Sequence, residues 1–98
     1  MIKVKKVEMI ANCMDARTIV KEMDQIGIDG YSMIRGVSGR GKHGKTREEG
    51  YTDTMASCYI MAACPEAEAE ALIVAVKPLL KRFGGIILVS DAQVVDFA

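Results

Sequence analysis

Several features that would identify a function directly are scarce in this sequence. It has no Trp, only five aromatic residues among 98, and a single His beside three Cys. With seven Met residues, the core is predicted to be aliphatic and rich in methionine. Cys13, Cys58 and Cys64 are odd in number and lack CxxC spacing. This argues against a zinc site, so we expect most of them to be small buried residues.

Net charge and long apolar runs are also missing. Thirteen basic residues balance thirteen acidic ones, which argues against a protein whose main task is to grip nucleic acid. No stretch resembles a signal peptide, and none is apolar over a length that spans a bilayer. We therefore expect the protein to be located in the reducing cytoplasm. There is no internal repeat, and residues 1–98 are predicted to form one small domain with a modest core.

The hydrophobic pattern predicts four strands and two helices. Strands are expected at residues 3–11, 28–35, 55–63 and 86–95. One helix follows Asn12 as its N-cap and stops at Gly27, and a second begins at Pro65 and closes at Gly84. Pro78 predicts a kink or an early end of the second helix near Val76. The order βαββαβ indicates an α+β, ferredoxin-like fold with both helices on one face of an antiparallel sheet.

Two helices leave the second face of such a sheet uncovered. We expect that face to carry part of the apolar strand residues, so that other subunits bury it. The candidates are Val7, Met9, Met33, Ile60, Ile87 and Val89.

The stretch from Gly30 to Asp53, which starts inside the second strand and leaves it at Gly36, carries the chemistry. Its glycines alternate with basic side chains, in the run GVSGRGKHGKTR. Glycine lets the backbone approach a ligand closely, and successive free N–H groups form a nest for an anion. Lys and Arg beside that nest add full positive charge. The stretch therefore predicts an anion site and lacks the paired base and nucleophile of an enzyme.

Plainer interpretations of individual residues remain open. His43 is predicted to be an exposed loop residue rather than a metal ligand or a proton carrier. Lys81 and Arg82 either complement the carboxyl end of a helix or contact a phosphate. Tyr51 either packs at the foot of the loop or is a modification site.

On the segments GYSMIRGVSGRGK, CPEAEAEALIVAVKPLL and KRFGGIILVSDAQVV, nearly the whole chain resembles the PII signalling proteins and their PII-like relatives. The VSGRGK turn is the specific motif of the three. The resemblance implies a cytoplasmic homotrimer that binds ADP, AMP or ATP in clefts between subunits, without catalysis or a required cofactor. The long loop between strands 2 and 3 would be the family's T-loop, through which a target protein or transporter is contacted.

The resemblance also implies a set of nucleotide-binding residues. Ser32 and Ala63 match positions near the adenine, and the T-loop base and the turn after the second helix (the B-loop) match positions near the phosphates. These are Gly39, Arg40, Gly41 and Lys42 for the T-loop base, and Lys81, Arg82, Phe83, Gly84 and Gly85 for the B-loop.

Departures from ordinary nitrogen-regulatory PII proteins narrow the resemblance. The B-loop is short, a TxG element is missing, and the chain stops soon after the fourth strand. The sequence looks more like the PII-like proteins encoded beside carboxysome or bicarbonate-transport genes. That branch implies bicarbonate as a further ligand, for which Lys45 and Arg47 are candidates, and a role in inorganic-carbon metabolism or transport.

Two alternatives remain beside this regulator. One is a small trimeric metal-binding protein of the divalent-cation tolerance type, for which the sequence offers only His43, Glu48, Glu49 and Cys58. The other is an ordinary nitrogen-regulatory PII protein.

Overall fold

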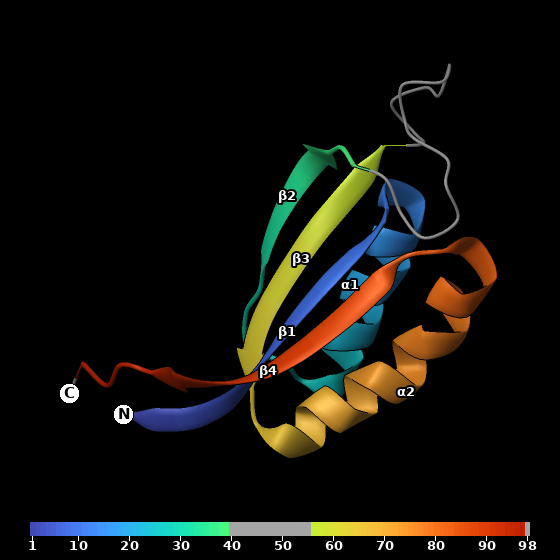
Figure 1. Cartoon of the computed structure of the whole chain (residues 1–98). Helices are drawn as coiled ribbons and strands as arrows, with labels where there is room; N and C mark the ends of the chain where they lie inside the picture. The colour runs from blue at the N-terminus through green and yellow to red at the C-terminus, as the bar shows by residue number, and fades with distance from the viewer. Residues whose placement is uncertain (40–55, 98) are drawn as a thin grey trace.

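Two layers make up the molecule, a four-stranded sheet and a pair of helices that pack on one of its faces (Figure 1). The computed structural model describes residues 1–39 and 56–97. Its elements are β1 (Ile2–Asn12), α1 (Cys13–Ile26), β2 (Ser32–Val37), β3 (Ser57–Cys64), α2 (Glu66–Phe83) and β4 (Ile86–Val94). The predicted ferredoxin-like βαββαβ fold is therefore confirmed.

The strand order in the sheet is β2-β3-β1-β4, and every neighbouring pair is antiparallel. β1 lies inside the sheet, where Val7 pairs with Ala62 of β3 on one side and with Val89 of β4 on the other. β1 and β4 continue together past the helices to the pair Ile2–Val94, and both chain ends lie there (Figure 1).

The caps of α1 form where the sequence predicts them. The Asn12 side chain accepts a hydrogen bond from the backbone N–H of Asp15 and donates one to the Asp15 carboxylate, each at 2.8 Å. These bonds satisfy a free donor of the first helical turn. Gly27 ends the helix with φ at 92°, a conformation that glycine adopts without steric penalty. Ile28 comes directly after it and is buried, and β2 begins only at Ser32.

α2 runs without interruption through Pro78 to Phe83, so the early end that was one of the two predicted effects of Pro78 near Val76 does not occur. Proline cannot donate a backbone hydrogen bond to residue 74. The Val74 side chain is exposed, so water can reach that turn of the helix. Val76 and Leu80 on the opposite side of α2 are buried, and their packing offsets the loss. Neither described helix is long and apolar enough to cross a membrane.

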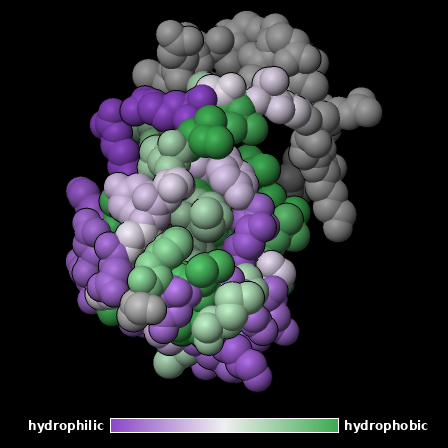
Figure 2. Space-filling model, turned by 90° about the vertical axis from the view of Figure 1, so that its left-hand side faces the viewer, coloured by the Kyte–Doolittle hydropathy of each residue, from purple (hydrophilic) through white to green (hydrophobic). Residues whose placement is uncertain are grey.

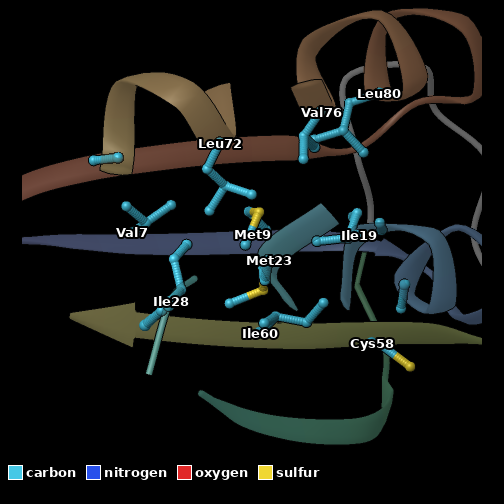
Figure 3. Close-up of a cluster of buried hydrophobic side chains, with 14 of the residues drawn as sticks. Val7, Met9, Ile19, Met23, Ile28, Cys58, Ile60, Leu72, Val76 and Leu80 are labelled. Atoms are coloured by element: carbon cyan, nitrogen blue, oxygen red, sulfur yellow. The ribbon is translucent and has the colours of Figure 1, made fainter. Parts of the chain in front are cut away.

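The core lies between the sheet and the helices (Figure 3). Val7, Met9 and Ile60 from the strands meet Ile19 of α1 and Leu72 of α2, and all five side chains are completely buried. No aromatic side chain takes part among the described residues, as the composition predicts.

The predicted contents of the uncovered sheet face were wrong. The register places the whole predicted set on the helix-covered side, because Met9 pairs with both Ile60 and Ile87, Val7 pairs with Val89, and Met33 pairs with Ile60. Residues one step away in sequence occupy the uncovered side, which we call the open face. Its apolar members include Ile10, Ile34, Tyr59, Met61, Ile86 and Leu88.

Two of the three cysteines form a disulfide, which the sequence analysis did not anticipate. Cys13, the first residue of α1, is bonded to Cys58 of β3, and their Cα atoms are 5.2 Å apart. Cys64 is buried and free. The expected burial of the cysteines is confirmed, but Cys13 and Cys58 are also a covalent link between helix and sheet.

Candidate functional site

The predicted nucleotide-binding residues fall into separate groups in one chain. Five of the predicted ligand-binding residues lie outside the described residues: Arg40, Gly41, Lys42, Lys45 and Arg47. The remainder occupy both ends of the sheet.

Ser32 and Ala63 lie at the end of the sheet where β3 leads into α2. Ser32 opens β2 and pairs with Met61, while Ala63 pairs with Lys6 of β1. Both residues are exposed and both belong to the open face. The structure therefore brings together the two residues that were predicted to lie near an adenine.

Gly39 and the α2–β4 turn lie at the other end of the sheet. Ser32 and Val37 are five strand residues apart, which at roughly 3.3 Å per residue is about 16 Å. Gly39 follows the edge strand β2, whereas Lys81–Gly85 precede the opposite edge strand β4. Three strand spacings of roughly 4.8 Å separate those two edges by about 14 Å. Within one chain, the predicted site residues therefore lie in three separate places: Ser32 with Ala63, Gly39, and the α2–β4 turn.

Two glycines shape the α2–β4 turn. Gly84 has φ at 88°, and its N–H donates to the Leu80 carbonyl at 2.8 Å. Gly85 has φ at 135°, and a Cβ there would stand 2.6 Å from the Ile10 carbonyl oxygen of β1. Any larger residue would push β4 away from β1. The turn is therefore held firmly against the centre of the sheet.

The cationic side chains of this turn are exposed. Lys81 and Arg82 occupy the last turn of α2, where they also complement the helix dipole. The Arg82 guanidinium lies 5.0 Å from the centre of the Phe83 ring, which is within cation–π range. Both alternatives for these residues, the helix end and a phosphate, are compatible with this placement.

Arg82 and Phe83 also border a hollow of about 300 Å³ between the helices, on the side away from the open face. Its floor includes Ile19, Val76 and Leu79. Glu22 and Arg82 are its charged lining residues, so their charges cancel and the hollow is not a cradle for phosphate.

A β-bulge marks the point where β2 leaves the regular ladder. The register shifts between Arg35 and Val37, and Gly36 between them has φ at 78°. A bulge bends a strand and changes the direction of the chain beyond it. The run GVSGRGKHGKTR at residues 36–47, which we call the glycine-basic run, begins at this position. The second strand was predicted to end here.

A polar cluster on the open face was missed by the sequence analysis. The Tyr59 hydroxyl donates to the Glu8 carboxylate at 2.7 Å, and the Lys6 ammonium lies 3.7 Å from the same carboxylate group. The hydrogen bond to Glu8 is the main reason that the pKa of Tyr59 is raised. In the sequence, Glu8 and Ile10 alternate with Val7 and Met9, and a charged residue among apolar neighbours was the available signal. We call Lys6, Glu8 and Tyr59 the open-face polar cluster.

In the described ranges 1–39 and 56–97, no three His, Cys, Asp or Glu side chains gather so that they could hold a metal ion. The alternative metal-site candidates His43, Glu48 and Glu49 lie outside those ranges, and Cys58 is engaged in the disulfide.

Comparison with known families gives one match that spans most of the chain. The model described as "Nitrogen regulatory protein P-II" matches residues 4–96. The comparison with curated proteins found no match.

Solved structures provide closely similar folds. CPII from Thiomonas intermedia K12, a nitrogen regulatory PII-like protein bound to ADP, AMP and bicarbonate, superposes with a TM-score of 0.83 at 28% identity. The superposition covers 94% of this chain and 88% of that one. CPII bound to ADP and bicarbonate gives a TM-score of 0.81 at 30% identity over the same shares of the two chains. The GlnK–ATP complex of B. subtilis, at 16% identity and a TM-score of 0.66 over 94% of this chain and 84% of that one, shows the fold alone.

Proposed function

Because the chain belongs to the nitrogen regulatory protein P-II family, we propose that it is a non-catalytic homotrimeric regulator that binds adenine nucleotides between its subunits. Proteins of this family form homotrimers and bind adenine nucleotides. The proposal for this chain adds the residues, the second ligand and the regulated process.

The observation that supports the proposal is that the predicted site residues are divided between the two ends of the sheet. Ser32 and Ala63 lie at one end of the sheet, and Gly39 and the α2–β4 turn lie at the other end on opposite edges. A ligand that touches an adenine position and a phosphate position needs groups from two chains. The open face would allow chains to associate, because burying its exposed side chains against another chain is favourable. These side chains are Ile34, Ile86 and Leu88. Figure 2 views the molecule from the sheet side and shows apolar patches there among hydrophilic residues.

Within such a cleft, the phosphates would be held by charge. Lys81 and Arg82 are exposed on an anchored turn, and Arg40 and Lys42 of a neighbouring chain would approach from the glycine-basic run. Charge-assisted hydrogen bonds of this kind contribute about 1.5–3 kcal/mol each. The adenine would lie near Ser32 and Ala63.

CPII supports bicarbonate as a second ligand, since it was solved with ADP and bicarbonate together. We assign Lys45 and Arg47 as the bicarbonate partners in this chain. The regulated process would be inorganic-carbon metabolism or transport, through a partner protein that contacts residues of the segment 40–55.

Titration calorimetry with ADP tests the nucleotide site. Arg82→Ala and Arg40→Ala are each expected to weaken ADP binding about tenfold, a loss of roughly 1.4 kcal/mol. Lys21→Ala, which removes an exposed cation from α1, is the matched control and should bind ADP like the wild type. Unchanged ADP affinity in both arginine variants would place the phosphates elsewhere.

Two further titrations separate this proposal from the alternatives. Heat on adding copper or zinc, with none on adding ADP, would favour a divalent-cation binding protein. Binding of 2-oxoglutarate together with ATP would favour an ordinary nitrogen-regulatory PII protein. Light scattering at micromolar concentration should give three times the 10.7 kDa chain mass, and a monomer would overturn the assembly.

A further inference from the structure

The Cys13–Cys58 disulfide occupies the junction between α1 and the sheet. It links the first residue of α1 with the second residue of β3, 45 positions along the chain. The backbone N–H of Cys13 also donates to the Ala56 carbonyl at 2.8 Å. The disulfide and this hydrogen bond therefore hold the same two short segments together.

Both described flanks of the 40–55 stretch meet at this junction. Cys58 pairs with Ala11 of β1 on one side and with Arg35 of β2 on the other, beside the Gly36 bulge. Ala56 is the first described residue after that stretch. Breaking or forming the Cys13–Cys58 bond therefore changes the constraints on the backbone at the point where the glycine-basic run joins the sheet.

The third cysteine is arranged differently. Cys64 lies six residues further along β3, or about 20 Å at roughly 3.3 Å per residue, so it is out of reach of the disulfide. Burial raises the pKa of the Cys64 thiol, with a smaller contribution from Glu68, which keeps it in the unreactive thiol form. Exchange with the disulfide therefore requires a thiol from outside the chain.

We propose that Cys13 and Cys58 are a reversible thiol–disulfide site that reacts with a dithiol of the thioredoxin or dithiothreitol type and controls how tightly the start of α1 is tied to Ala56–Cys58. Both residues are buried, and Cys13 is the less buried of the two, 8% exposed against 1% for Cys58, so we take the Cys13 sulfur as the one attacked. This site is independent of nucleotide binding, because the bond joins two cysteines of the chain and forms without a ligand.

The exchange balances in two steps. A thiolate of the reagent attacks the Cys13 sulfur, the bond between Cys13 and Cys58 breaks, and Cys58 leaves as a thiolate that takes up a proton. The second thiol of the reagent then attacks its own sulfur in the mixed disulfide and releases Cys13. The protein gains two electrons and two protons, and the reagent becomes a disulfide. Oxidation by a disulfide reagent runs in the opposite direction, with Cys13 at the amino end of α1 as the attacking thiolate.

The first experiment counts thiols in the full chain without nucleotide. Native protein is incubated with dithiothreitol or with glutathione disulfide, quenched with acid, denatured and alkylated, and its mass is measured. We expect one alkylated thiol after oxidation, that of Cys64, and three after reduction, with full return on re-oxidation. A disulfide that dithiothreitol reduces only after denaturation would overturn the proposal. Cys64→Ser is the control and should lose one alkylated thiol in both states.

The second experiment measures amide hydrogen exchange in both states. The Cys13 amide, which donates to Ala56, should exchange at least about tenfold faster in the reduced protein. Amides in the middle of α2 should be unaffected. Cys58→Ser should match the reduced wild type, and equal Cys13 exchange in the two states of the wild type would overturn the proposal. Because neither experiment uses ADP, their failure leaves the proposed nucleotide site intact, and failure of ADP binding leaves these results intact.

Discussion

The two faces of the sheet are built from the same strands but differ in what completes them. On the helix-covered face, Val7, Met9 and Ile60 lose all contact with water through contacts inside one chain. On the open face, Ile34 keeps 58% of its surface exposed and Leu88 keeps 52%, and the open-face polar cluster lies among such apolar residues. The first face is a finished core at the centre of the sheet, whereas Val89 on the edge strand β4 keeps 42% of its surface exposed. The second face is a surface with exposed apolar area, which the proposed trimer would bury.

The largest expected effect tests the finished core. Ile60→Ala removes a fully buried side chain and leaves a cavity, which should lower the free energy of unfolding by about 2–5 kcal/mol. Ile34→Ala on the adjacent strand is the matched control, and in a monomeric form it should change stability by less than about 1 kcal/mol. Urea denaturation of both variants makes the comparison. Equal losses would show that the faces are not distinct.

The next effect tests the open face as an interface. In the proposed trimer, Ile34→Glu would bury an unpaired carboxylate, so the dissociation constant of the assembly should rise at least about a hundredfold. The chain should stay folded, since residue 34 is exposed within it. Val74→Glu places the same charge on an exposed position of α2 and should leave the mass unchanged. Light scattering over a dilution series provides the measurement, and an intact Ile34→Glu trimer would contradict the interface.

A smaller effect concerns the open-face polar cluster. The pKa of Tyr59 is raised mainly by its hydrogen bond to Glu8, so the neutral phenol is favoured in the folded state. This stabilisation is present below the ordinary value of 10.0 and is lost as pH rises through the folded pKa. Ultraviolet titration should show a raised phenol step that Glu8→Gln lowers and Tyr59→Phe removes. An identical titration in wild type and Glu8→Gln would contradict the hydrogen bond.

The smallest effect belongs to Asp15 at the start of α1. Burial raises the pKa of Asp15, and the hydrogen bond from Asn12 partly opposes the change. The folded state therefore holds its proton more tightly, and the contribution of Asp15 to stability falls as pH rises above the ordinary value of 3.8. Asp15→Asn should remove this component from stability measured across acidic pH. Glu22→Gln on the same helix should not remove it.

The sequence predicted best the features that are decided locally. The start of α1 at Asn12 and its end at Gly27 result from capping chemistry within a few residues, and both are confirmed. The βαββαβ order and the resemblance to PII-like proteins are confirmed as well, the latter by the family match over residues 4–96.

Features that depend on distant neighbours were predicted less well. Alternation separated Val7 and Met9 from Glu8 and Ile10, but only the packing of the helices decides which set is covered. The helix passes Pro78 because its buried side is held by the core. Cys13 and Cys58 meet because α1 begins beside β3, which no spacing rule reveals. The resemblance implied clefts between subunits, but the sequence did not say which site residues one chain would place at each end of the sheet, and their binding roles stay predictions.

The close approach of Gly85 to β1 limits how the α2–β4 turn can change in length. A side chain at position 85 would meet the Ile10 carbonyl, where there is no room even for a methyl group, so a residue inserted after Gly84 must still leave glycine at this point. Residues 81–83 before it are exposed, so insertions belong ahead of Gly84. Relatives with a longer turn are therefore expected to keep the two glycines that lead into β4 and to lengthen only the solvent-facing part of the turn. Ligand preference can then diverge while the sheet stays the same.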